Sequence, residues 1–137
     1  MEWLMLGILA VQMTAGVVLL TRVLRAGHGI GTAVASHVGS GVAALVFWLL
    51  FVATGVVLWA WLTFVALTVG NTVGDGLLRD RARRLSGRSD GLWRDYGAAI
   101  AAVFRGQMPG LVTFHALFAG VVYFGCLGIC IGATIAS

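Results

Sequence analysis

Two histidines, His37 and His115, are the residues of this chain whose type and position best suit chemistry. His37 lies within residues 26–74, which contain no Asp, Glu, Lys or Arg, and His115 lies in a second such run, residues 106–137. An ionisable side chain inside an apolar run is costly and usually has a partner or a function. A neutral imidazole can bind a metal ion through one ring nitrogen, and it can also exchange a proton near neutral pH.

The two histidines are expected to lie at the same depth. Each follows an arginine, Arg25 or Arg105, by about three helical turns. In an up-down four-helix bundle the second and fourth helices are diagonal neighbours, so their inward side chains meet across the bundle axis. Two imidazoles on facing helices can bind haem iron from both axial sides. We therefore expect His37 and His115 to be the ligands of a haem b iron.

Small residues next to both histidines would leave room for a porphyrin. They are Ala33, Ser36, Gly39, Ser40, Gly41 and Ala44 around His37, and Ala116, Ala119 and Gly120 around His115. The haem propionates need cations at the membrane edge, and four candidates follow from the sequence: Arg22, Arg25, His28 and Arg105. His28, close to Arg25, is expected to lie at the membrane interface and not to be a ligand of the haem iron.

Two other interpretations of the histidine pair stay open. Runs of small residues also let bare helices pack closely, and an intramembrane histidine can hydrogen-bond a hydroxyl or a backbone carbonyl with no further function. The pair can also transfer a proton or an ion.

The composition indicates a membrane protein. The chain has 137 residues, of which 60% are hydrophobic and 10% are charged, and its mean hydropathy is +0.99. A soluble domain carries about 25% charged residues, so this chain cannot cover a surface that faces water. All nine basic residues are arginines beside apolar runs. That distribution is typical of membrane topology and anionic lipid, and it argues against nucleic acid as a partner.

Four apolar stretches are long enough to cross a bilayer, which takes about 20 residues of helix. We predict spans at about residues 3–25, 30–54, 56–77 and 110–136. The first is expected to be a retained span and not a secretory signal, because its arginines follow it. A turn is predicted at Thr54-Gly55, since glycine permits a tight backbone. Trp48, Trp59 and Trp61 flank this turn at the spacing of an interfacial aromatic belt, although Trp48 lies rather deep for that.

An amphipathic helix is predicted between the third and fourth spans, over about residues 89–105, with Ser89 as its N-cap. Its apolar residues recur at helical spacing and are Leu92, Trp93, Tyr96, Ile100, Val103 and Phe104. We expect this helix to lie in the cytoplasmic interface and to dock its apolar stripe against the mouth of the bundle. An ordinary ordered loop is the alternative.

The expected fold is therefore an all-α integral membrane protein that forms a single domain over residues 1–137. It has four transmembrane helices in an up-down bundle and one interfacial helix. All arginines fall on one side of this arrangement, so the positive-inside rule makes that side cytoplasmic and leaves both termini outside. The expected location is the cytoplasmic membrane of a bacterium.

A polar stripe ends the third span and is a second candidate site. Its residues lie three and four apart and are Thr68, Asn71, Thr72 and Asp75. Such a stripe could coordinate a cation or pass a proton. The same segment contains Gly70 and Gly74 in a helix-packing pattern, and Asp75 can instead form an ion pair with the nearby arginines.

Cys126 and Cys130 are a third candidate site, because a spacing of four places them on one helix face near the outer side. Two thiols suit a soft metal such as copper(I), with Met5 as a possible further ligand. Free cysteine is also a common small apolar residue in cores, which is the favoured interpretation.

Two segments carry a resemblance to known proteins: ASHVGSGVAALVFWLLFVATG in the second span and MPGLVTFHALFAGVVYF in the fourth. They resemble the small uncharacterised four-span membrane proteins of high-GC bacteria. In layout the chain is also similar to the four-helix haem b core of cytochrome b561-like proteins. That resemblance implies histidine ligands on facing spans, which map onto His37 and His115 alone. The family's further spans and second histidine pair have no counterpart here, so electron transfer across the membrane would need a partner cofactor.

Three functions are carried forward from the sequence. The leading one is a haem b-binding redox or anchor subunit that exchanges electrons with quinone or a partner. The first alternative is a non-catalytic accessory subunit of a larger membrane complex, for which Gly128 and Gly132 offer a packing face. The second alternative is a small transporter or channel formed by oligomerisation. The expected partners are the lipid bilayer and either other membrane subunits or further copies of this chain.

Overall fold

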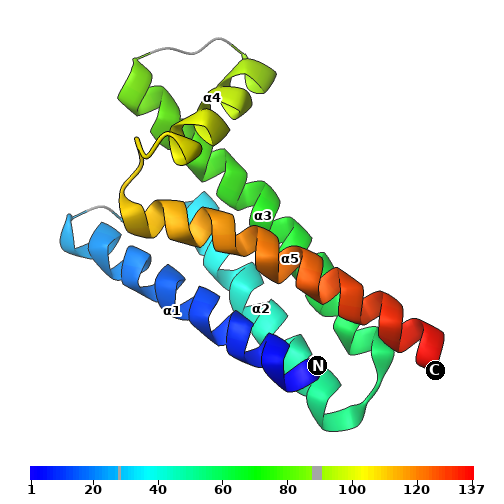
Figure 1. Ribbon diagram of the computed structural model, residues 1–137. Coiled ribbons are helices and arrows are strands. Elements are labelled where there is room, and N and C mark those ends of the chain that lie inside the picture. Colours follow the sequence, from blue (N-terminus) through cyan, green and yellow to red (C-terminus); the bar gives the residue numbers. More distant parts are fainter. Residues whose placement is uncertain (28, 88–90) are drawn as a thin grey trace.

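A computed structural model describes residues 1–27, 29–87 and 91–137, and within these ranges the regular structure is entirely helical. The helices are α1 (Glu2–Arg25), α2 (Thr32–Thr54), α3 (Val57–Ser86), α4 (Leu92–Phe104) and α5 (Gly110–Ala136) (Figure 1). The four helices α1, α2, α3 and α5 are long and apolar enough to cross a membrane, which confirms the prediction of four such helices. At 1.5 Å per residue each exceeds the roughly 30 Å of bilayer hydrocarbon.

The four long helices form an up-down bundle, as expected. They run in alternating directions, and both chain termini lie at the same end as the α2–α3 turn (Figure 1). Helix α1 packs against α2 and α5, and α3 packs against the same two helices. The helices α2 and α5 are therefore diagonal to each other. We call the end with the termini the terminal end, and the end with Arg22, Arg25 and α4 the arginine end.

The turn between α2 and α3 falls where the sequence predicts it. Gly55 has a φ of +69°, which only glycine adopts without strain, and its N–H donates to the Phe51 carbonyl at 2.8 Å. Because the connection is so short, α2 and α3 must lie side by side, and they make the most extensive contact in the bundle.

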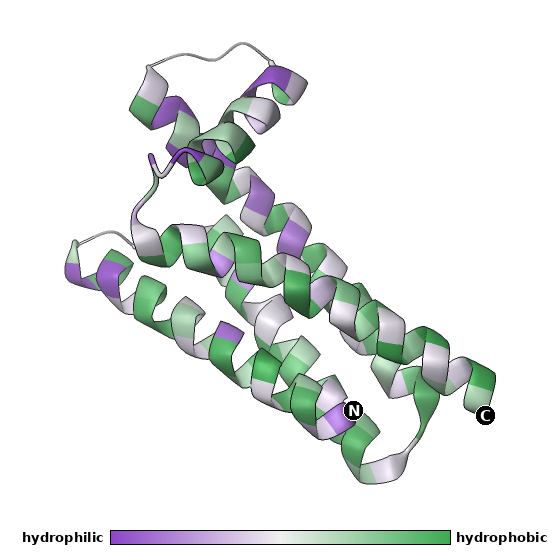
Figure 2. Cartoon of the chain, in the orientation of Figure 1, coloured by the Kyte–Doolittle hydropathy of each residue, from purple (hydrophilic) through white to green (hydrophobic). Residues whose placement is uncertain are grey.

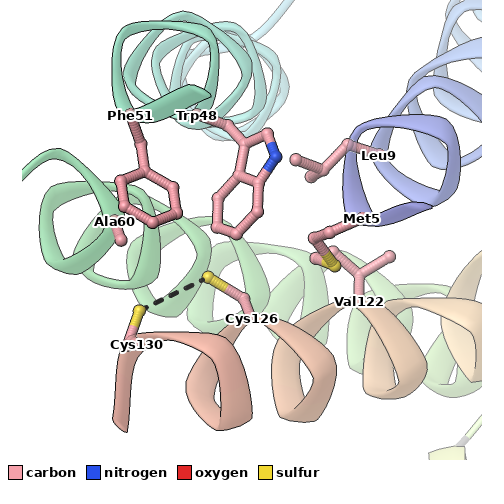
Figure 3. Packing of buried hydrophobic residues seen from close by; sticks show 8 residues of the cluster. All are labelled: Met5, Leu9, Trp48, Phe51, Ala60, Val122, Cys126 and Cys130. Atoms are coloured by element: carbon pink, nitrogen blue, oxygen red, sulfur yellow. Dashed lines mark hydrogen bonds between the residues drawn. The ribbon is translucent and has the colours of Figure 1, made fainter. Parts of the chain in front are cut away.

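The main hydrophobic core lies toward the terminal end. Its buried residues are Met5, Leu9, Trp48, Phe51, Ala60, Val122, Cys126 and Cys130 (Figure 3). Trp48 is fully buried and its indole N–H donates to the Glu2 carbonyl at 3.1 Å. Trp48 is therefore a core residue, in line with the depth that sets it apart from the other two tryptophans in the sequence. The residue lies deep enough along α2 to reach between the helices, and its one polar atom is satisfied there.

Helix α3 is longer than its predicted span. It continues past residue 77 to Ser86 and ends at Gly87, whose φ is +65° and whose N–H donates to the Arg83 carbonyl at 2.9 Å. The arginine-rich segment was excluded from the span because it is polar. Polarity marks where the hydrocarbon ends and does not by itself end a helix, whereas a left-handed glycine does.

Helix α4 packs on this extension of α3 with a different face from the predicted one. The contact is made by Asp95 and by a second small core of Ala82, Ala99, Ala102, Val103 and Met108. Most of the predicted apolar stripe points away: Leu92, Trp93, Ile100 and Phe104 are exposed. Alanines allow the two helix backbones to approach closely, which large aromatic side chains would prevent. The helix begins after Gly91, and the predicted cap Ser89 lies outside the described residues.

Two polar contacts join α4 to α3. The Arg83 Nε donates to Asp95 Oδ2 at 2.6 Å, and the Asp95 side chain is only 5% exposed. The Tyr96 hydroxyl donates to Asp75 Oδ2 at 3.3 Å, and the Asp75 carboxylate raises the pKa of Tyr96 above its ordinary value. Among the described residues, the structure thus pairs Asp75 with a tyrosine and not with an arginine.

We expect Asp95→Ala to release α4 from α3, because the variant leaves Arg83 without its buried partner. A hydrogen bond between charged groups contributes about 1.5–3 kcal/mol, so amide exchange in α4 should speed up by roughly ten- to a hundredfold. The matched control is Asp80→Ala, since Asp80 contacts the same Arg83 at 3.5 Å on the exposed side. That pair should contribute at most about 1 kcal/mol. Equal effects of the two variants would contradict this account of the α3–α4 contact.

Candidate functional site

His37 and His115 meet across the diagonal of the bundle. Their ring centroids are 5.9 Å apart and the ring planes are inclined at 80°. Each lies about one and a half turns into its helix, α2 or α5, counted from the arginine end. The sequence-based expectation that the two rings face each other is therefore correct. It follows from their similar depth on helices that run in the same direction.

His37 is seated against two glycines of α3. Its Nδ1 lies 2.9 Å from the Gly70 carbonyl oxygen. A carbonyl only accepts, so Nδ1 carries the proton and Nε2 has the free lone pair. A Cβ placed on Gly74 would lie 2.9 Å from His37 Cε1, and one on Gly70 would lie 2.8 Å from Ser40 Oγ. The Gly70-x-x-x-Gly74 pattern thus serves close packing of α3 on α2, and it makes the space that the imidazole occupies.

His115 is seated in the same way against α1. A Cβ on Gly16 would lie 3.3 Å from His115 Cε1, and the His115 carbonyl accepts a hydrogen bond from Gln12 Nε2 at 3.0 Å. Within the described part of the chain, His115 Nδ1 and Gln12 Oε1 are buried without a hydrogen-bond partner. An unpaired buried polar atom costs about 1–3 kcal/mol, so these atoms mark a site suited to a polar or metal-containing ligand.

The ring separation is close to that of two axial imidazoles on one metal ion, and the edge-to-face inclination of 80° is also that of two rings in direct contact. Two imidazoles that each bind a metal at about 2 Å hold their ring centroids about 6 Å apart, close to the observed separation. The Nε2 atoms of His37 and His115 make no hydrogen bond to any described residue. No third His, Cys, Asp or Glu joins the pair among the described residues. A bare transition-metal ion needs more protein ligands than this, whereas a metal in a planar macrocycle needs only the axial two.

The predicted cations lie at the expected end but do not contact the rings. Arg22 and Arg25 are in the last turn of α1, and Arg105 follows α4. All three are exposed, and none makes a side-chain hydrogen bond or ion pair to a described residue. His28, the fourth predicted cation, lies outside the described residues.

Two of the four residues of the polar stripe lie on the outer surface of α3. Thr68 and Thr72 are exposed, and their hydroxyls donate to the Phe64 and Thr68 carbonyls of their own helix. Asp75 is bound by Tyr96 at the arginine end. Hydroxyls that bond back to their own helix are satisfied in lipid and need no ion or water.

Cys126 and Cys130 belong to the hydrophobic core. Their sulfur atoms are 4.0 Å apart, both residues are free thiols, and both are fully buried beside Trp48 and Phe51 (Figure 3). Met5 lies in the same cluster. No third His, Cys, Asp or Glu accompanies them among the described residues. The favoured interpretation of two small apolar core residues accounts for this environment.

One polar residue of the site does not figure among the sequence-based predictions. Gln12, the one amide of the first span, donates a hydrogen bond to the backbone carbonyl of His115. The signal for Gln12 is present in the sequence, because a lone amide in an apolar span calls for a partner.

The geometry of the histidine pair is the basis for inferring a function. The two imidazoles, their glycine seats and the unpaired polar atoms beside them are the features from which it can be argued. Comparison with protein-family models, with curated proteins and with solved structures finds nothing that matches this chain.

Proposed function

We propose that this protein binds one haem b between His37 and His115 and acts as a redox or anchor subunit in a membrane. The observation that carries the proposal is the 5.9 Å separation of the two ring centroids across the bundle diagonal. A bis-histidine site leaves iron no open position, so the haem would supply reversible one-electron transfer. The electron partner would be quinone or another membrane subunit.

The surroundings of the rings support this proposal. The hydrogen bond from His37 Nδ1 to the Gly70 carbonyl fixes the ring orientation and leaves Nε2 free, which is the usual arrangement of a metal-binding histidine. Gly16 and Gly74 keep side chains away from the rings on the two flanking helices, α1 and α3. The purely structural alternative accounts for the His37 hydrogen bond equally well.

The test is the absorption spectrum of protein purified from haem-replete cells. We expect dithionite reduction to produce a sharp α band of b type, with about one haem per chain. A colourless preparation from cells with adequate haem would overturn the proposal. It would favour the accessory-subunit alternative, whose supporting observation is the open space beside the exposed Gly128 and Gly132 of α5.

We also propose that the bundle lies in the cytoplasmic membrane with its arginine end inside and both termini outside. Hydrophilic residues gather at the arginine end, while the remainder of the bundle is largely apolar (Figure 2). Arginines near span ends are retained on the cytoplasmic side. A reporter that is active only in the cytoplasm should be inactive when fused after Ser137 and active when inserted between α3 and α4. The reverse result would contradict the orientation.

The exposed face of α4 is proposed to lie in the cytoplasmic interface. Its exposed apolar residues are Leu92, Trp93, Ile100 and Phe104. Burying one large apolar side chain is worth roughly 1.5–3 kcal/mol, and Arg94 and Arg105 would favour anionic lipid.

A peptide of residues 91–105 tests this placement. We expect it to become helical on vesicles that contain anionic lipid, and less so in high salt. The control peptide carries Trp93→Ser and Phe104→Ser and should stay disordered. If the unmodified peptide also stays disordered, this face is better explained as a docking site for another subunit.

A further inference from the structure

Gln12 of α1 and His115 of α5 contact each other at the histidine site. The Gln12 Nε2 donates a hydrogen bond to the His115 backbone carbonyl at 3.0 Å, and the His115 ring packs on Gly16, one turn further along α1. Helix α1 thus holds His115 in the way that α3 holds His37. One difference separates the two seats. His37 Nδ1 lies 2.9 Å from the Gly70 carbonyl oxygen, whereas His115 Nδ1 has no hydrogen-bond partner among the described residues.

Two unpaired polar atoms belong to this pair of residues. Gln12 Oε1 and His115 Nδ1 are both buried without a hydrogen-bond partner in the described part of the chain. The oxygen and nitrogen of an amide are only about 2.2 Å apart, so Gln12 Oε1 lies within roughly 5 Å of the His115 carbonyl oxygen. The terminal torsion of a glutamine side chain has broad minima, so the amide can turn toward the ring at little cost.

The two atoms become complementary when His115 Nε2 binds a metal ion. A histidine that is bound through Nε2 carries its remaining proton on Nδ1, so Nδ1 is then a donor, whereas an amide oxygen only accepts. A buried donor and a buried acceptor are each costly when unpaired, and one hydrogen bond between them removes both costs. Metal-binding histidines almost always donate the other ring N–H to an acceptor, which fixes the ring orientation and makes the ligand more basic.

We propose that Gln12 is the positioning residue of His115, and that its Oε1 accepts a hydrogen bond from His115 Nδ1 when Nε2 binds the haem iron. This inference rests on the proposed function. The Gln12 side chain then has the role toward His115 that the Gly70 carbonyl has toward His37. The competing acceptor is the backbone carbonyl of Gln12, which also faces the His115 ring, and the test separates the two.

The test compares midpoint potential and haem release in the purified, haem-loaded protein and its variants. Gln12→Met keeps the side-chain length and the backbone carbonyl but removes the amide oxygen. A hydrogen bond from Nδ1 makes the imidazole a stronger electron donor and so stabilises ferric iron. The variant should therefore have a higher midpoint potential, and haem transfer to an acceptor protein should be about tenfold faster or more.

The matched control is Thr14→Ala, on the same helix as Gln12. Thr14 is exposed, and its hydroxyl donates to the Ala10 carbonyl of its own helix at 2.8 Å. This variant should change the rate of haem release by less than about threefold and leave the midpoint potential unchanged.

Gln12→Glu is the second variant, and it restores an oxygen at the same position. Its midpoint potential should lie at or below that of the wild type, because a carboxyl oxygen also accepts from Nδ1. A purely structural role of Gln12 would not separate the two variants in potential. Wild-type potential and release in Gln12→Met, or an equally raised potential in Gln12→Glu, would overturn this inference and leave the proposed function standing. A wild-type protein that binds no haem would overturn both.

Discussion

Replacing His37 or His115 by alanine is expected to abolish the b-type spectrum. Each variant keeps only one of the two proposed axial ligands. Among the described residues, no other His, Cys, Asp or Glu lies beside the pair to take the place of the missing ligand. The haem content of the purified variants should fall at least about tenfold, as is typical when a metal site loses a key partner. The measurement is the reduced-minus-oxidised spectrum, normalised to protein.

The fold should survive both histidine substitutions. Neither ring belongs to the hydrophobic core around Trp48, which lies nearer the terminal end. The matched control is Ser40→Ala, one turn along α2 from His37. The Ser40 hydroxyl donates to the carbonyl of its own helix, at His37, so its removal should leave the haem content unchanged. Well-folded histidine variants with full haem occupancy would show that the ligands lie elsewhere.

The largest loss of stability is expected from Trp48→Ala. The indole is fully buried, lies 5.3 Å from the Phe51 ring centroid and donates a hydrogen bond to the first turn of α1. Truncating a buried tryptophan costs about 3–5 kcal/mol, because the lost contacts leave a cavity that the bundle only partly closes. The free energy of unfolding in mixed micelles should fall by that amount.

Trp3→Ala is the matched control for this prediction. Trp3 lies at the same end of the bundle, but its side chain is 72% exposed, so its truncation leaves no cavity in the core. Its removal should change the free energy of unfolding by less than about 1 kcal/mol. If both tryptophans contributed equally, Trp48 would have to be an interfacial anchor after all.

The apolar runs of the sequence by themselves determined the number of long helices and their order. A run without charge that is twice the length needed to cross a bilayer must fold back once, and Gly55 is where the backbone allows it. Short connections then force neighbours in sequence to be neighbours in space, which makes α2 and α5 diagonal. The equal depth of His37 and His115 follows from these constraints, whereas the inward rotation that brings the two rings together does not.

Only the tertiary structure decided how each helix is rotated and which residues meet between helices. A helix that is apolar on all sides shows no stripe from which its buried face can be read, so the sequence does not reveal that Trp48 packs in the core or that Gln12 contacts His115. In lipid, close packing favours small residues where helices touch. The sequence shows which residues are small but not which partner each one contacts, and in the structure Gly16 contacts His115 and Gly74 contacts His37. Small residues also form the contact between α4 and α3: the alanines of α4 pack against α3, and Trp93 and Phe104 are exposed.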